Sequence, residues 1–248
     1  MKSVDALVGA INLDASHRPE PINTQATLVA YAAKEFAFPD RQFMVFSEAS
    51  GVDFGRNIAA TWNGLEPDKP NTRGHAKRVA KAEQVGLRYD SRQHKFTPSD
   101  QTALVWDTTW TAGTQTESAY GKYTHFRFTR ETGHIVQLWA VHMPHTRGKA
   151  KAWELLLKHV DEVRGGERPE DDHDEIILAG DFNASPHALR AHFASMDMCY
   201  AVDEESENTT EKRKPDNIVS SGRVKPATVV AGTHFTHKPI HSEVVIEK

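Results

Sequence analysis

An apolar run that ends in glycine, aspartate, phenylalanine and asparagine constrains this 248-residue chain more than any other feature. Residues 176–186 read Ile-Ile-Leu-Ala-Gly-Asp-Phe-Asn-Ala-Ser-Pro. The apolar part predicts a buried strand. Ser185 and Pro186 predict the start of a helix, because serine caps helices and proline favours their first position. A strand that leads directly into a helix is typical of α/β folds.

Two polar side chains follow this strand. Because side chains alternate along an extended chain, we expect Asp181 and Asn183 to point the same way, at the edge where open α/β sheets bind ligands. A carboxylate accepts hydrogen bonds and carries charge, and a carboxamide also donates, so the pair suits a phosphate and an attacking water. The alternative is a strand-to-helix turn in which both residues serve only turn chemistry.

In the rest of the chain, segments with the hydrophobic periodicity of strands alternate with segments that have the periodicity of helices. We expect further strands at 6–12, 43–48, 101–106, 214–220, 228–230 and 236–246, a hairpin of 123–129 and 135–142, and helices at 23–36, 74–85, 149–164 and 185–193. This order predicts an α/β fold. No repeat or linker interrupts it, so we expect one domain spanning residues 1–248.

The composition of the chain limits the classes of function and the cellular location that we expect. The chain has no apolar run of membrane-spanning length and no signal-like N-terminal segment, so we expect a cytoplasmic protein with neither a membrane nor an obligate protein partner. Cys199 is the only cysteine, which excludes an intrachain disulfide and a cysteine-based zinc site. The net charge is −4, so contact with nucleic acid requires a local basic patch.

Polar residues end several other predicted strands. Glu48 is a candidate ligand for a hard cation such as Mg²⁺, although a surface or capping role is the alternative. His142 is either a satisfied core residue or a phosphate ligand. With His145 it also resembles half of a zinc site, but a third clear ligand is missing.

Residues 73–95 carry seven Lys or Arg against two acidic residues. Arg73, Lys77 and Lys81 repeat every four residues and share one face of the predicted helix. This face can contact a phosphate backbone, with Trp62 and Tyr89 as stacking groups, or it can be a solvated surface.

The order of these elements resembles the endonuclease/exonuclease/phosphatase superfamily. The resemblance rests on strands that end in Asn12, Glu48, His142 and Gly-Asp-Phe-Asn, followed by Asp216 and a C-terminal histidine before x-Pro-Ile. It implies two packed mixed β-sheets flanked by helices, a four-layer α/β sandwich. It also implies a phosphodiesterase that depends on a divalent metal, Mg²⁺ or Mn²⁺.

The resemblance also implies a role for each matched residue. Glu48 is the principal metal ligand, Asn12 supports the metal and the phosphate, and His142 holds a non-bridging phosphate oxygen. The water and the phosphate are positioned or activated by the pair Asp181 and Asn183.

Asp216 orients the catalytic histidine, which we identify as His237. One position departs from the family pattern: Thr236 stands where many members have an aspartate that helps the metal site. His241 is a rival for the histidine, but it lacks the following proline.

The resulting hypothesis is a nuclease that hydrolyses DNA by in-line attack of an activated water. One alternative is a phosphatase or phospholipase that acts on a small phosphoester or lipid headgroup. The other is a non-catalytic binding module of the same fold, for which Thr236 is the only support.

Overall fold

The computed structural model describes residues 4–13, 41–48, 58, 102–107, 109–117, 122–146, 148–165, 174–210, 212–230 and 235–246. Its strands are β1 (Val4–Asn12), β2 (Arg41–Ser47), β3 (Thr102–Trp106), β4 (Trp110–Glu117), β5 (Tyr123–Arg130), β6 (Ile135–His142), β7 (Glu175–Asp181), β8 (Cys199–Tyr200), β9 (Asp216–Ser220), β10 (Thr228–Val229) and β11 (Ile240–Ile246). Two helices, α4 (Lys149–Arg164) and α5 (Pro186–His192), accompany them.

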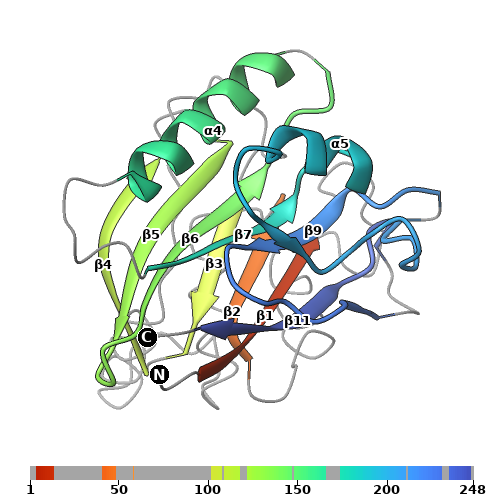
Figure 1. Ribbon diagram of the computed structural model, residues 1–248. Coiled ribbons are helices and arrows are strands. Elements are labelled where there is room, and N and C mark those ends of the chain that lie inside the picture. Colours follow the sequence, from red (N-terminus) through yellow and green to blue (C-terminus); the bar gives the residue numbers. More distant parts are fainter. Residues whose placement is uncertain are drawn as a thin grey trace, which may run out of the picture.

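The strands form two mixed sheets, which face each other (Figure 1). The five-stranded sheet has the order β10-β11-β1-β2-β3, and the six-stranded sheet has the order β4-β5-β6-β7-β9-β8. Strand β1 runs parallel to β2, and β6 runs parallel to β7, whereas the other neighbours are antiparallel. In each sheet, therefore, a parallel pair of strands ends at the same edge.

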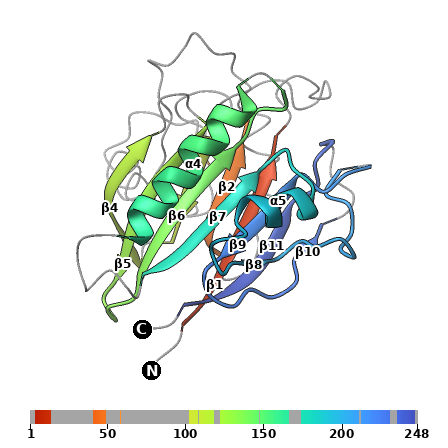
Figure 2. The same cartoon turned by 45° about the horizontal axis from the view of Figure 1, so that its top comes forward.

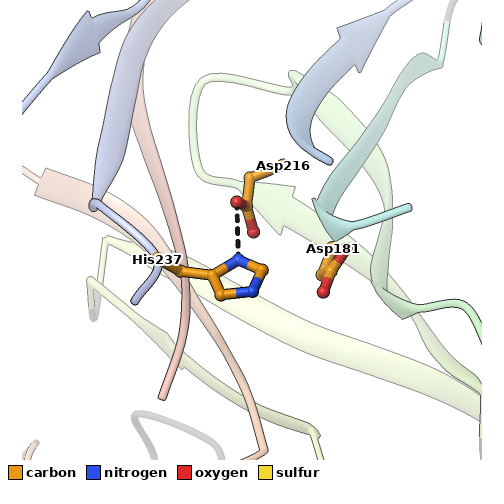
Figure 3. A group of neighbouring side chains, drawn as sticks. All are labelled: Asp181, Asp216 and His237. Atoms are coloured by element: carbon orange, nitrogen blue, oxygen red, sulfur yellow. Dashed lines mark hydrogen bonds and ion pairs between the residues drawn. The ribbon is translucent and has the colours of Figure 1, made fainter. Parts of the chain in front are cut away.

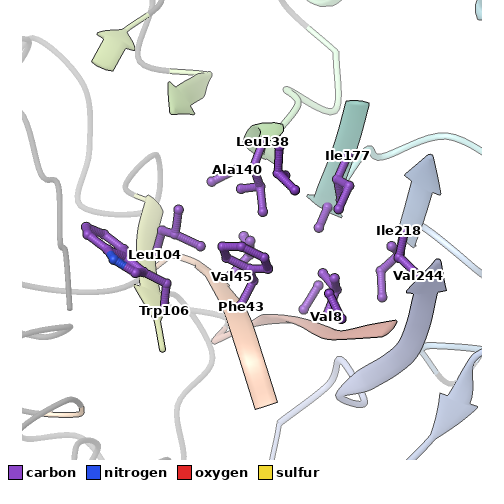
Figure 4. Packing of buried hydrophobic residues seen from close by; sticks show 14 of the residues in the cluster. Val8, Phe43, Val45, Leu104, Trp106, Leu138, Ala140, Ile177, Ile218 and Val244 are labelled. Carbon is purple, nitrogen blue, oxygen red and sulfur yellow. The ribbon is translucent and has the colours of Figure 1, made fainter. Parts of the chain in front are cut away.

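The main hydrophobic core lies between the sheets (Figure 4). It is built from alternate residues of each strand, because alternate side chains share one face. Val8 and Phe43 enter it from one sheet, and Leu138, Ile177 and Ile218 enter it from the other. This packing fixes which residues at the strand ends face inward.

A second core lies between the six-stranded sheet and α4, which lies along the outer face of that sheet (Figure 2). Trp153, Leu156 and Val160 are the buried stripe of this amphipathic helix, and they pack with Trp139 and Leu178 of the sheet. The predicted α/β sandwich of two packed mixed sheets is confirmed. The described residues include one of the expected helical layers, which covers the six-stranded sheet.

Most predicted elements are found where the periodicity places them. The hairpin of β5 and β6 and the helix α4 match closely, but the last strand begins at Ile240 rather than at 236, and β9 begins at Asp216 rather than at 214. The sequence did not predict β4 or the two-residue β8. The predicted helices at 23–36 and 74–85 lie outside the described residues. Among the described helices, none is long and apolar enough to cross a membrane.

Candidate active site

The inward-facing rows of the two sheets end in polar residues at one edge. Asn12 and Ser47 are register partners at the ends of β1 and β2. His142 pairs with Asp181 at the ends of β6 and β7, and Asp181 pairs with Asp216 at the start of β9. All five side chains are buried. The apolar core is thus replaced by polar groups at the edge where ligands bind in α/β sheets.

Asn12 holds two carboxylates together. Its Nδ2 donates to Oε1 of Glu48 over 3.1 Å and to Oδ2 of Asp181 over 2.8 Å. The amide orientation follows from these partners, because only the nitrogen can donate to a carboxylate. Asn12 therefore links the ends of the two sheets and sets the positions of both acidic groups.

Glu48 follows β2 in an unusual backbone conformation. Its φ of 54° lies in the left-handed region, which residues other than glycine seldom adopt. Such conformations cluster at functional sites and cost of order 1 kcal/mol or more. The Oε1 atom of Glu48 also lies 3.6 Å from Nε2 of His142, so this carboxylate contacts residues from both sheets.

The turn after β7 joins Asp181 to Asn183. Oδ1 of Asp181 accepts from the backbone N–H of Asn183 over 2.8 Å, which is the turn bond typical of aspartate. The Asn183 amide donates to the Met143 carbonyl over 2.7 Å and to Oδ2 of Asp181 over 3.3 Å. Both donors of this amide are used within the protein, so the geometry favours a role for Asn183 in orienting Asp181. The turn chemistry is present in the structure, and the role of both residues at a reactive site stays a prediction.

Gly180 allows the close approach of β6 and β7 beside the site. Its φ is 136°, and a Cβ atom at this position would lie 2.1 Å from the Val141 carbonyl oxygen. The same oxygen accepts a hydrogen bond from the Ser47 hydroxyl over 3.1 Å, which connects the two sheets. The glycine of Gly-Asp-Phe-Asn thus has a steric explanation.

Asp216 and His237 form a second pair, which faces Asp181 (Figure 3). Nδ1 of His237 lies 2.8 Å from Oδ2 of Asp216, a carboxylate with no exposed surface. Donation from Nδ1 leaves Nε2 as the acceptor, because a neutral imidazole carries one proton. The other ring nitrogen points toward Asp181. One ligand atom from each of the three residues lies within 4.8 Å of the others.

The structure places the two candidate histidines, His237 and His241, in different surroundings. His241 alternates with Ile240 and Ser242, which face inward, so it lies on the opposite face of the five-stranded sheet, where burial lowers its pKa. The group of three possible metal ligands found among the described residues is Asp181, Asp216 and His237, and it includes neither histidine of the alternative zinc pair, His142 and His145.

Some features of the site were not predicted from the sequence. Ser47 bridges the sheets, and Lys149 at the start of α4 donates from Nζ to the Asn183 carbonyl over 2.7 Å. Ser47 could have been predicted, because the alternation of side chains along β2 places it among the inward-facing residues. No sequence pattern pointed to Lys149. The predicted substrate contacts Arg73, Lys77 and Lys81 lie outside the described residues.

The donor set fits a hard divalent cation. Asp181 and Asp216 offer carboxylate oxygens beside His237, and Glu48 offers one on the Asn12 side of Asp181; Mg²⁺ and Mn²⁺ prefer such ligands. Oδ1 of Asp216 is buried and has no hydrogen-bond partner within the described part of the chain. Asp181 lies between the Asn12–Glu48 pair and the Asp216–His237 pair, so it can contribute to a cation on either side.

Comparison with solved structures gives the class of fold. The chain matches truncated TDP2 from Caenorhabditis elegans with a TM-score of 0.61 and 11% identity, and the match covers 97% of each chain. D. rerio TDP2, solved in complex with a single-strand DNA product, matches with a TM-score of 0.54 and 12% identity over 96% of this chain and 98% of that one.

An endonuclease/exonuclease/phosphatase protein from Beutenbergia cavernae matches with a TM-score of 0.55 and 14% identity, over 98% of this chain and 72% of that one. No protein-family model and no curated protein sequence matches the chain. The chain therefore has the fold of the endonuclease/exonuclease/phosphatase superfamily. The resemblance predicted from the ordered strand-end residues is confirmed at the level of the fold.

Proposed function

We propose that this protein is a divalent-metal-dependent phosphodiesterase and that its substrate is DNA. The observation that carries the proposal is the pair of buried Asp216 and partly buried His237, which faces Asp181 at the polar edge of this fold. A histidine held by a buried carboxylate and facing a second carboxylate is suited to moving a proton during hydrolysis.

Mg²⁺ or Mn²⁺, held by Glu48 with support from Asn12 and Asp181, would neutralise charge on the phosphoryl group and on the leaving oxygen. The remaining work is positioning and proton transfer by the protein. Phosphoryl transfer depends mainly on such positioning and electrostatics.

His237 is the proposed proton acceptor. As water attacks phosphorus, one of its protons moves to Nε2 of His237, and the bond to the leaving oxygen breaks. The products are a phosphomonoester and an alcohol, whose oxygen takes a proton from solvent. Asp216 stabilises the imidazolium ion that forms and keeps the ring in the correct tautomer. Asp181 orients the attacking water, and Asn183 holds Asp181.

His142 is the proposed contact to a non-bridging phosphate oxygen. Its Nε2 lies 3.6 Å from Glu48, so the imidazole is adjacent to the proposed metal ligand. A hydrogen bond from this ring strengthens as charge grows on the phosphate oxygens in the transition state.

The choice of DNA rests on two supports. D. rerio TDP2, which shares this fold, was solved with a single-strand DNA product. Residues 73–95 of this chain are strongly basic and include Arg73, Lys77 and Lys81. A nuclease that contacts the phosphate backbone in this way should bind more weakly as salt rises.

The test is cleavage of supercoiled plasmid and of labelled single- and double-stranded oligonucleotides with Mg²⁺, with Mn²⁺ and with EDTA. Glu48→Gln and Asp181→Asn are compared with Asp161→Asn, a control on the exposed side of α4. We expect metal-dependent cleavage that both site variants lose and the control keeps. Cleavage of only small phosphoesters or phospholipids would contradict the DNA assignment. Absence of both metal binding and turnover would indicate a binding module instead.

A further inference from the structure

A cleft with a volume of about 430 Å³ opens beside the candidate active site. The turn after β7 forms one wall, from Asn183 to Pro186, and residues of the 204–215 segment form the other. Asn183 belongs to both the cleft and the Asp181 turn. The cleft therefore borders the turn that carries Asp181.

The charge of the cleft is opposite to that of the chain. Three cationic residues, Lys212, Arg213 and Lys214, line it together with a single carboxylate, Glu204. The chain as a whole has a net charge of −4, so the positive charge here is a local feature.

Hydrogen bonds engage two acidic groups of this segment, Glu204 and Asp203, whereas Glu205 and Glu207 of the same segment are exposed. Oε1 of Glu204 accepts from the backbone N–H of His187 over 2.6 Å. Oδ1 of Asp203 accepts from the backbone N–H groups of Glu205 and Ser206 over 3.0 and 2.9 Å. These carboxylates stabilise the loop itself, and neither forms an ion pair with the cleft cations within the described ranges.

The cationic turn is held in place. Oγ1 of Thr210 accepts from the backbone N–H of Arg213 over 2.9 Å, and the Thr210 N–H donates back to the Arg213 carbonyl over 3.0 Å. Nζ of Lys214 donates to the carbonyls of Asp203 and Glu204. The side chains of Lys212 and Arg213, by contrast, make no hydrogen bond or ion pair with any residue that the structure describes, and both are exposed.

The turn is also tied to the proposed catalytic pair. Oγ1 of Thr209 accepts from the backbone N–H of Asp216 over 3.3 Å, and the Thr209 carbonyl accepts from the Lys238 N–H over 2.6 Å. Residues on either side of the cationic turn are therefore anchored next to Asp216 and His237. The backbone that carries Lys212 and Arg213 therefore has a defined position relative to the candidate active site.

We infer that this cleft binds the phosphate backbone of the nucleic-acid strand on one side of the scissile phosphodiester, through Lys212 and Arg213. The inference rests on the proposed function and extends it. Arginine and lysine side chains contact phosphates without reading sequence, and they fix the register of the strand. Asn208, which also lines the cleft, adds a neutral donor.

The test is equilibrium binding of a fluorescently labelled single-stranded oligonucleotide, measured by anisotropy in EDTA between about 50 and 200 mM salt. Lys212→Gln/Arg213→Gln is compared with Lys158→Gln/Arg164→Gln, a control double variant on exposed positions of α4 that removes the same charge. We expect the first to weaken binding about tenfold at low salt and to reduce the slope of log K against log salt by about 1.4, for two lost phosphate contacts. The control should match the wild type.

An equal loss in both double variants, or an unchanged salt slope in the first, would overturn the inference. Far-ultraviolet circular dichroism checks that both variants are folded. Hydrolysis of a small nucleoside phosphodiester by the wild-type protein tests the proposed function separately. Hydrolysis with an unchanged salt slope refutes only the cleft, whereas a reduced slope without hydrolysis refutes only the catalytic proposal.

Discussion

Nδ1 of His237 lies 2.8 Å from Oδ2 of Asp216, and the two residues come from segments 21 positions apart in the sequence. Asp216 opens the buried strand β9, so its carboxylate has little freedom to move. His237 lies in the turn before β11. The buried carboxylate therefore determines the orientation of the His237 ring.

This relationship predicts the effect of Asp216→Asn. An amide nitrogen facing Nδ1 would favour the tautomer with its proton on Nε2, which cannot accept a proton from water. We expect kcat to fall by a factor of about 10² to 10⁴ with KM changed by only a few fold. Steady-state kinetics on an oligonucleotide measure this, and the similar size of the two side chains preserves packing. A kcat close to that of the wild type would exclude the proposed role of Asp216.

Asn12→Asp tests the link between the two carboxylates. The variant replaces a donor with a third negative group beside Glu48 and Asp181. At pH 7 in EDTA we expect a loss of about 1.5–3 kcal/mol of unfolding free energy, the range for hydrogen bonds to charged groups. Mg²⁺ or Mn²⁺ should raise the melting temperature of the variant more than that of the wild type, because binding to the folded state stabilises it. A metal-induced shift no larger than that of the wild type would contradict this arrangement.

Gly180→Ala tests the close approach of β6 and β7. The new Cβ would lie 2.1 Å from a backbone carbonyl oxygen, so a strand must move. We expect a loss of about 3 kcal/mol or more, measured by urea unfolding. Gly148→Ala is the matched control: its φ of 77° is also positive, but nothing lies within 4 Å of the added atom. The control should lose only about 1–2 kcal/mol, from backbone strain alone. Equal losses would show that strain, not contact, determines the effect at Gly180.

Two histidines in contact between β5 and α4, His125 and His159, predict acid sensitivity. The His125 ring stacks on Trp139 at 4.2 Å and contacts the edge of His159 at 4.9 Å between ring centroids. Burial lowers the pKa of His125 to about 4. A hydrogen bond to the side-chain oxygen of Gln137 opposes this effect, and the proximity of His159 adds to it. Burial also lowers the pKa of His159, although nearby Glu162 opposes this.

The unfolded chain therefore binds more protons than the folded one between about pH 6.5 and pH 4. Stability is fully present above this range and falls as the pH drops through it, by up to about 3 kcal/mol for His125. His125→Gln should flatten this part of the stability–pH curve, measured by urea unfolding. His187→Gln, at an exposed position of α5, is the control. An unchanged curve in the His125 variant would show that other groups cause the acid sensitivity.

Much of the fold could be predicted because its signals are local. The apolar run before Asp181 and the amphipathic stripe of α4 each require only their own periodicity. Strand β4 was not predicted because it lies at the edge of its sheet. Polar residues such as Thr111, Gln115 and Thr116 replace the apolar alternation that would have indicated a strand. The pairing of strands into two sheets came from the family resemblance, since periodicity does not specify which strands are neighbours.

The candidate site was partly predictable for the same reason. Asn12, Glu48 and Asp181 each end a predicted strand, which is a local signal, but the family resemblance, not periodicity, implied that they would meet at one site. The contact between Lys149 and the Asn183 carbonyl depends on the docking of α4 and left no local signal. The roles assigned to these residues, and the extent of the single domain, stay predictions.

The central claim is that water attacks phosphorus at this site. Cleavage of an oligonucleotide in water enriched in oxygen-18, with Mg²⁺ or with EDTA, tests it most directly, because mass spectrometry locates the label in the products. We predict one labelled oxygen per cleavage, found in the new phosphate group, with Mg²⁺ and no product with EDTA or with His237→Ala. Label in the alcohol product, or equal cleavage by His237→Ala, would contradict the account.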